Sequence, residues 1–318
     1  MVADTVVGDT VVSNPVVADS TRDSTMVADT TRDITAVDKL DITEFKALVR
    51  CEGARLYRDL PWRDTRDPYL VLCSEVMLQQ TQVKRVLNYW EKWATAFPTI
   101  DALAAASVAD VLEAWQGLGY NRRALALKRA ADICSARYDG EIPEGYPELL
   151  VLPGVGPTTA AGVCIFAFGQ VQVYLETNVR AVFIHHFFKD CDKVQDSEIV
   201  PLLRACCDVD DPRSWYYALL DYGNHLKSIM PNPSRRSASY ARQSAFEGSL
   251  RQKRAFLLRE LLEGSKRSAD ELLQALSLVE IQAGRAAMAR NDMEDILSAL
   301  AAEGFIAAVD EDCWTIAE

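Results

Sequence analysis

Apolar positions recur every three to four residues along most of this chain, which is the spacing of amphipathic helices. After Ile42, with Thr43 as the expected cap, the pattern predicts further helices over 69–93 in two parts, 100–106, 108–115, 121–138, 158–168 and 177–188. Nearly every segment through Leu226 has this pattern, and the connections are short. The fold class that follows is mainly α, with a compact two-lobed helical body.

The stretch from Leu152 to Arg180 combines a glycine hairpin with two helices. Gly154 and Gly156 permit a tight turn with unobstructed N–H groups, and the apolar helix that follows indicates burial. A hairpin that ends at a helix N-terminus is a ready site for a phosphate group. Glu176 begins the next helix, where the helix dipole stabilises a carboxylate. A plain turn with an N-capping acid explains the same residues, so both interpretations stay open.

One acidic residue, Glu75, lies among apolar residues of the helix after Tyr69. Desolvation on such a face raises the pKa of a carboxyl group, so Glu75 can hold a proton near neutral pH. A place on the solvated side of the helix is the alternative. Gln79 and Gln80 follow in a run of uncharged hydrogen-bonding residues, suited to filling a gap in a base stack, to reading base edges, or to an ordinary surface.

A second glycine turn, from Gly117 to Tyr120, precedes a helix that carries Arg122 and further basic residues. A basic helix after such a turn can contact a phosphate backbone. It can equally be a solvated face.

The charge of the chain is concentrated at its ends. The formal net charge is −12; residues 1–41 carry −5 and residues 270–318 carry −9, so the residues between them carry +2. The first forty residues repeat their own segments without aromatic residues or a helical period, which predicts a disordered tail. Met26, inside this tail, is a second candidate start.

Cysteine spacing and hydropathy bear on the compartment. The eight cysteines lack C-x-x-C spacing, which indicates reduced thiols in a cytoplasmic protein. No apolar run is long enough to span a membrane and no signal peptide opens the chain, so we expect no membrane association.

The end of the chain has a pattern of its own. Helices are predicted over 251–263, 269–276 and 286–303, followed by a short hairpin that turns at 310–312. Three helices and a hairpin are the outline of a small winged-helix-like domain. Its acidic turn disfavours contact with phosphates, so we expect a packing role or a protein contact for this domain instead.

Six strings of the sequence are similar to those of helix-hairpin-helix (HhH-GPD) DNA glycosylases, and in particular to the MutY-type adenine glycosylase branch. They are LPWR at 60–63, PY at 68–69, SEVMLQQTQV at 74–83, GLGY at 117–120, LPGVG at 152–156 and ETNV at 176–179. The similarity covers residues 43–230, and the longest string is the most specific. It implies an enzyme that flips a base out of duplex DNA and hydrolyses its N-glycosidic bond.

The resemblance implies roles for two carboxyl groups. Glu75 would donate the proton to the leaving base, and Glu176 would stand at the family's catalytic aspartate, facing the sugar cation and the incoming water. Asn178 would help to position that carboxylate or the DNA backbone. Thr158 stands where the endonuclease III branch has its Schiff-base lysine, so we expect a monofunctional glycosylase.

Three departures from the family pattern stand out. Glu176 replaces an aspartate, and because its extra methylene moves the carboxylate, a misplacement on the order of 1 Å can cost about a hundredfold in rate. Asn121 replaces the aromatic residue that wedges into DNA in many relatives, which weakens the case for A:8-oxoguanine recognition. The segment after Lys227 lacks the family's four cluster cysteines, so we expect no [4Fe–4S] cluster and no other cofactor or metal.

The segment that replaces the cluster loop is basic. Residues 227–254 carry a local charge of +6, so we expect this segment to contact DNA phosphates; a linker that pairs with the acidic end of the chain is the alternative. The DNA-binding residues expected in total are Gln79, Gln80, Tyr120, Arg122, Gly154, Gly156, Thr158, Arg235 and Arg236.

The sequence therefore predicts a tail over 1–40, a glycosylase domain over 41–230, a basic linker over 231–250 and the winged-helix-like domain over 251–318. The favoured function is base-excision repair by a monomeric glycosylase that acts on double-stranded DNA with a mismatched or damaged base, and the favoured substrate is adenine in a mispair. Two alternatives remain: a non-catalytic DNA-binding protein of glycosylase ancestry, and a glycosylase for uracil, thymine or hypoxanthine.

Overall fold

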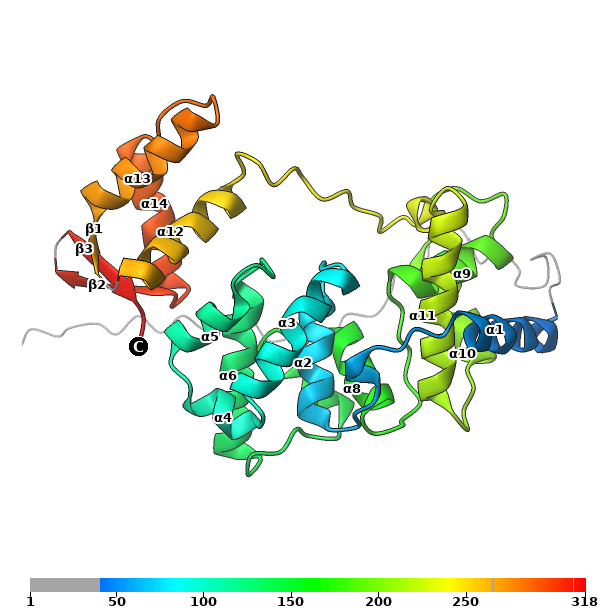
Figure 1. Cartoon of the computed structure of the whole chain (residues 1–318). Helices are drawn as coiled ribbons and strands as arrows, with labels where there is room; N and C mark the ends of the chain where they lie inside the picture. Colours follow the sequence, from blue (N-terminus) through cyan, green and yellow to red (C-terminus); the bar gives the residue numbers. More distant parts are fainter. Residues whose placement is uncertain (1–40, 265, 311) are drawn as a thin grey trace, which may run out of the picture. The chain divides into compact units, whose positions relative to one another are not determined.

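The computed structural model describes residues 41–264, 266–310 and 312–318 (Figure 1). The predicted disordered tail and the question of Met26 lie outside the described residues. The helices up to residue 236 are α1 (Ile42–Leu56), η2 (Pro61–Arg63), α2 (Pro68–Leu78), α3 (Val83–Ala96), α4 (Ile100–Ala105), α5 (Val108–Trp115), α6 (Arg122–Arg137), α7 (Tyr146–Leu150), α8 (Pro157–Phe166), α9 (Thr177–Phe187), α10 (Asp196–Cys206), α11 (Pro212–Ile229) and η3 (Pro233–Arg236).

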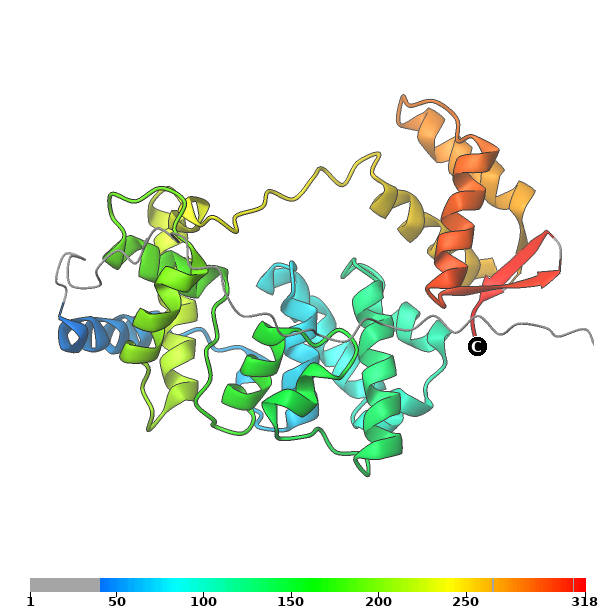
Figure 2. The same cartoon turned by 180° about the vertical axis from the view of Figure 1, so that it is seen from behind.

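These helices form two lobes, which confirms the mainly α, two-lobed prediction (Figures 1 and 2). In one lobe α2 packs against α3, α6 and α8, and α6 packs against α4 and α5. Its core includes Trp93 and Trp115, whose rings meet edge to face at 5.2 Å. In the other lobe α11 lies along α1 and α9, around Phe45, Phe183 and Trp215. The extended segment between α8 and α9 runs from one lobe to the other.

A buried ion pair joins the lobes. Arg63, at the end of η2, donates from Nη1 and Nη2 to the two carboxylate oxygens of Asp221 on α11, at 2.7 and 2.8 Å. Arg58 donates from Nε to the same carboxylate at 2.5 Å, and Arg213 of α11 donates to the carbonyl oxygens of Arg63 and Thr65, at 2.7 Å each. The chain that leads into α2 is therefore fixed against the second lobe.

Two helix starts follow from capping residues. The Asp41 carboxylate accepts a hydrogen bond from the Thr43 N–H at 2.9 Å, so the cap of α1 is Asp41, and the prediction of Thr43 was wrong by two residues. Asp67 caps α2 by accepting from the N–H groups of Tyr69 and Leu70.

Among the described helices, none combines the length and the apolar character needed to cross a bilayer.

The last part of the chain has the element order of a winged helix. It consists of α12 (Leu250–Gly264), β1 (Arg267–Ser268), α13 (Ala269–Gln282), α14 (Arg290–Ala302), β2 (Ile306–Asp310) and β3 (Cys313–Ile316). The strands form an antiparallel sheet in the order β1-β3-β2. The sequence did not predict β1, and it placed the start of α14 four residues too early. The core of this part, around Leu257 and Leu297, includes Leu112 and Leu125 of α5 and α6.

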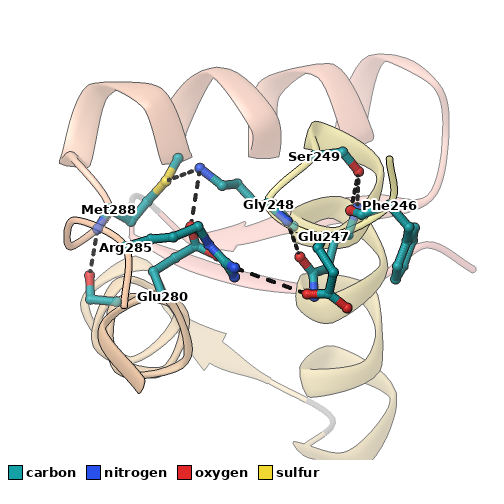
Figure 3. Close-up of polar contacts among 10 residues, drawn as sticks. Phe246, Glu247, Gly248, Ser249, Glu280, Arg285 and Met288 are labelled. Carbon is teal, nitrogen blue, oxygen red and sulfur yellow. Dashed lines mark hydrogen bonds and ion pairs between the residues drawn. The ribbon is translucent and has the colours of Figure 1, made fainter. Parts of the chain in front are cut away.

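Charged pairs fix the segment that leads into α12 (Figure 3). Arg285 lies between two acidic residues: it donates to the buried Glu280 carboxylate at 2.8 and 2.9 Å, and its guanidinium is 4.0 Å from the Glu247 carboxylate. The Arg285 hydrogen bond lowers the pKa of Glu280. Lys253 donates to the sulfur of Met288 at 3.5 Å and lies 3.8 Å from the same Glu280 carboxylate. The Lys253–Glu280 pair fits the interpretation of the basic segment as a linker that pairs with the acidic end of the chain.

Candidate active site

Glu75 lies on α2, where it faces α8. Gly162 of α8 makes this contact possible, because a Cβ at Gly162 would lie 2.3 Å from Oε2 of Glu75. The hydroxyl of Tyr174 donates to the same oxygen at 3.1 Å. Burial raises the pKa of Glu75 to about 8; the Tyr174 hydrogen bond lowers it, and the charge of Glu176 raises it. Glu75 is therefore largely protonated at neutral pH, as the sequence analysis expected for a buried acid.

Glu176 is the N-cap residue of α9. Its Oε1 accepts hydrogen bonds from the N–H groups of Asn178 and Val179, at 2.6 and 3.0 Å, and its Oε2 accepts from the Asn178 side chain at 3.2 Å. Burial raises the pKa of Glu176, whereas these hydrogen bonds and the positive charge of Lys227 lower it. The Oδ1 atom of Asn178 is buried, with no partner among the described residues. A buried acceptor without a partner is available to a bound molecule.

Tyr174 lies beside Glu75 and was not predicted from the sequence. Its hydroxyl donates to Glu75; burial raises its pKa, and the charges of both Glu75 and Glu176 raise it further. Residues two apart in an extended segment point to the same side, so the spacing of Tyr174 and Glu176 was the available signal. The ring of Tyr174 meets Phe166 edge to face at 5.3 Å, and Tyr217 stacks on Phe166 at 4.6 Å. Two acidic side chains and three aromatic rings thus lie together where α2, α8, α9 and α11 meet.

The glycine hairpin precedes α8, the helix that carries Gly162. Gly154 has a φ of +77° and its Cβ position lies 2.7 Å from the side chain of Ala126, so both conformation and space require glycine. Gly156 is the N-cap of α8, and a Cβ there would meet no atom within 4 Å. Thr158, in the first turn, is exposed. The N-terminus of α8 is thus open, as an anion site at a helix start requires.

Comparisons with known proteins cover the segment that carries these residues. The sequence of residues 73–200 matches the HhH-GPD superfamily of base excision DNA repair proteins. This segment is an HhH-GPD domain. It contains Glu75, Glu176, Asn178 and the glycine hairpin.

Relatives of the HhH-GPD domain include adenine DNA glycosylases. The protein of that name from Mycobacterium tuberculosis (strain ATCC 25618 / H37Rv) is 46% identical over 129 residues, which are 40% of this chain and 42% of the relative. The Homo sapiens protein of that name is 38% identical over 154 residues, which are 46% of this chain and 28% of the relative. The chain therefore spans less than half the length of these curated relatives.

Solved structures share the fold. A thermostable thymine-DNA glycosylase matches with a TM-score of 0.52 at 24% identity, covering 57% of this chain and 85% of that one. A non-covalent endonuclease III–DNA complex matches with a TM-score of 0.52 at 20% identity, covering 61% and 91%. At these identities the likeness concerns the fold alone.

The turn after α2 of the HhH-GPD domain presents one of its two glutamines. Gln80 is exposed, with a φ of +53°, whereas the Gln79 side chain donates to the hydroxyl of Thr159 on α8 at 2.9 Å. Arg123, which the sequence analysis did not single out, fixes this turn. Its guanidinium donates to the carbonyl oxygens of Gln79 and Gly119, at 2.5 and 2.9 Å, and so ties the two predicted DNA-facing turns together.

Tyr120 and Arg122, two predicted DNA contacts, have partners late in the chain. The Tyr120 hydroxyl accepts a hydrogen bond from Arg251 at 2.6 Å. Arg122 donates from Nε and Nη2 to the Glu303 carboxylate, at 2.6 Å each. The described structure thus engages both residues with the winged-helix-like part.

Arg235 and Arg236 differ in their environments. Arg236 donates to the carbonyl oxygens of Phe188, Lys189 and Ile184, at 2.5, 2.6 and 3.2 Å, and so satisfies carbonyl groups at the end of α9. Arg235 is exposed. Arg235 is thus the more exposed of the two arginines.

The segment between α11 and α12 contains no cysteine. The cysteines nearest to it in sequence, Cys206 and Cys207, are buried at the end of α10, and Cys313 lies in β3. Within 41–264, 266–310 and 312–318, no group of three or more histidine, cysteine or acidic side chains is placed to hold a metal ion. The residues of this segment do not fit the [4Fe–4S] cluster that the family resemblance implies, so no step proposed below involves one.

Proposed function

We propose that this protein is a monofunctional DNA glycosylase that hydrolyses the N-glycosidic bond of a flipped adenine in a mispair. The observation that carries the proposal is the juxtaposition of Glu75 and Glu176 around Tyr174, with Glu75 protonated at neutral pH. The adenine DNA glycosylase names of the relatives support adenine as the base. The DNA complexes among proteins of the same fold support duplex DNA as the partner.

Glu75 acts as the general acid in this proposal. Departure of a purine from its sugar is accelerated when the base receives a proton, and a carboxyl group with a pKa of about 8 still carries that proton at pH 7. The Tyr174 hydroxyl holds Oε2 of Glu75 and so orients the carboxyl group. The aromatic rings beside it offer stacking surfaces for a flipped base.

Glu176 acts on the sugar side. The N–H groups at the start of α9 and the nearby Lys227 oppose the effect of burial and favour the ionised carboxylate. An ionised carboxylate stabilises the oxocarbenium-like sugar cation. The unpartnered Oδ1 of Asn178 is an acceptor for the attacking water. The C–N bond breaks and the base leaves with the proton from Glu75, while water adds to the anomeric carbon and gives up a proton to the Glu176 carboxylate.

The remaining parts of the proposal concern DNA and product. The open N-terminus of α8 at Gly156 binds a phosphate next to the flipped nucleotide, and the exposed Gln80 enters the space left in the duplex. Thr158 offers no amine, so the abasic product is released intact. We propose that the protein works as a monomer without an iron–sulfur cluster.

Single-turnover assays on labelled duplexes test this function. The panel contains A:8-oxoguanine, A:G, G:T, G:U and inosine pairs, each examined before and after alkali. We expect alkali-dependent strand breaks on an adenine mispair, and loss of breaks in Glu75→Gln with retained duplex binding. Tight binding without breaks on any pair would favour the non-catalytic alternative, and breaks confined to G:T, G:U or inosine would replace adenine with that base. Breaks without alkali would refute the monofunctional assignment.

A further inference from the structure

Lys227 lies in the last turn of α11, the helix that packs along α9. One turn earlier, Gly223 touches the start of α9 so closely that a Cβ would lie 2.2 Å from the carbonyl oxygen of Asn178. Residues four apart share a face of a helix. The Lys227 side chain therefore leaves α11 on the side that meets the first turn of α9, where Glu176 is the cap.

The ammonium group of Lys227 has no hydrogen bond or ion pair within 4 Å among the described residues, although the residue is half-buried. Burial lowers the pKa of Lys227; of the two charged groups that act on it, Glu176 raises that pKa and Arg58 lowers it. Arg58 is already paired with Asp221 at 2.5 Å. The charge of Lys227 is thus left to act on Glu176, whose pKa it lowers.

Glu176 needs such a charge. Its surroundings are the N–H groups of α9, the Asn178 amide, Tyr174 and the acid Glu75. Burial alone favours the protonated form of Glu176. Two protonated acids in one site would leave the sugar cation without a counter-charge. The positive charge of Lys227 lowers the pKa of Glu176 and so opposes the effect of burial.

We propose that Lys227 is a positioning residue of the reaction: its ammonium group, one turn along α11 from the Gly223–Asn178 contact, keeps Glu176 ionised while Glu75 stays protonated. The proposal rests on the proposed glycosylase function and assigns a residue outside the HhH-GPD match at 73–200. It explains why a lysine is held half-buried without a partner of its own.

The pH profile of single-turnover cleavage separates this role from a structural one. In the wild type the acid limb reports ionisation of Glu176 and the alkaline limb reports loss of the proton from Glu75. In Lys227→Met the acid limb should move to higher pH, so the rate constant at pH 6 falls about tenfold more than at pH 7.5. The alkaline limb should stay in place. Lys227→Arg should restore the acid limb, and Lys92→Met, which removes an exposed lysine of α3, should leave the profile unchanged.

An unchanged acid limb in Lys227→Met, or an equal loss at every pH, would overturn the proposal. A second measurement does not need turnover. It is an NMR titration of protein labelled at the glutamate δ-carbon, in which the Glu176 signal is assigned by its disappearance in Glu176→Gln. Lys227→Met and Lys227→Gln should raise the titration midpoint of Glu176. If the wild type cleaves no duplex but the Glu176 midpoint shifts in the Lys227 variants, the glycosylase function is refuted and the charge coupling between Lys227 and Glu176 stands. An unshifted Glu176 midpoint would refute the coupling itself.

Discussion

Replacement of Gly162 by alanine should separate activity from stability. The new Cβ would lie 2.3 Å from Oε2 of Glu75, 2.7 Å from its Cδ and 3.1 Å from a ring carbon of Tyr174. Ordinary contact begins near 3.4 Å, so the carboxyl oxygen must move by 3.4 − 2.3 = 1.1 Å. The Glu75 side chain is flexible and can make this movement without displacing the backbone.

The substitution should change the rate constant strongly and the stability little. A displacement of a reacting group by about 1 Å costs on the order of a hundredfold in rate, so single-turnover cleavage by Gly162→Ala should fall by about that factor. Alanine is favoured over glycine inside a helix by about 1 kcal/mol. The gain offsets the cost of moving the side chain, so the free energy of unfolding in urea should stay within about 1 kcal/mol of the wild type.

Gly53 supplies the matched control. Its Cβ would lie 2.3 Å from Cβ and 2.9 Å from the backbone Cα of Ala218, on the neighbouring helix α11. A side-chain rotation cannot move the Ala218 Cα out of this contact, so Gly53→Ala should lower the free energy of unfolding. The rate constant of the folded fraction should stay unchanged. Full activity in Gly162→Ala would refute the reasoning, because Glu75 would then not work from the place described.

Three further predictions concern charge and protonation. Asp221→Asn leaves the buried Arg63 guanidinium, 2% exposed, without its counter-charge, and should lower the free energy of unfolding by about 3–5 kcal/mol; a loss below about 1 kcal/mol in urea would show that Arg58 and Arg63 do not depend on it. Tyr174→Phe removes a hydrogen bond that lowers the pKa of Glu75, so the alkaline limb of the cleavage profile should move to higher pH; a shift to lower pH would contradict the assignment. The pKa of Glu75 rises from 4.5 to about 8 on folding, so its contribution to stability is complete below pH 4.5 and is lost as pH rises through about 8. Urea denaturation across this range should show a decline that Glu75→Gln reduces, and an equal decline in both proteins would show that Glu75 is not its source.

The helical body was predictable because local signals agree with the packing. Apolar spacing fixed most helices to within a few residues, and α5 matches its predicted bounds. The cap of α1 was misplaced because Asp41 and Thr43 are both good capping residues, and only the geometry decides between them. The strand β1 has two residues and pairs with a segment almost fifty residues later, so no local period announces it.

The candidate site was predictable where a motif carries the chemistry. Glu75 and Glu176 lie close enough for the charge of Glu176 to raise the pKa of Glu75, and the catalytic roles that the resemblance implied for them stay predictions. Lys227 and Tyr174 were missed because their roles depend on which helices pack side by side. Arg122 shows what a local pattern cannot predict. An arginine after a glycine turn suggests a phosphate contact, yet its side chain pairs with the carboxylate of Glu303, which lies 181 residues away in the sequence.

The central claim is that Glu75 and Glu176 act as one unit with opposite protonation states. The most direct test is single-turnover cleavage by Glu75→Gln, Glu176→Gln and the double variant, on the pair that the wild type cuts. We predict that each single variant loses about a thousandfold or more and that the double variant is little slower than the slower single one, because groups that act together are not additive. A single variant that keeps a rate within about tenfold of the wild type, or a double variant in which both losses multiply in full, would contradict the account.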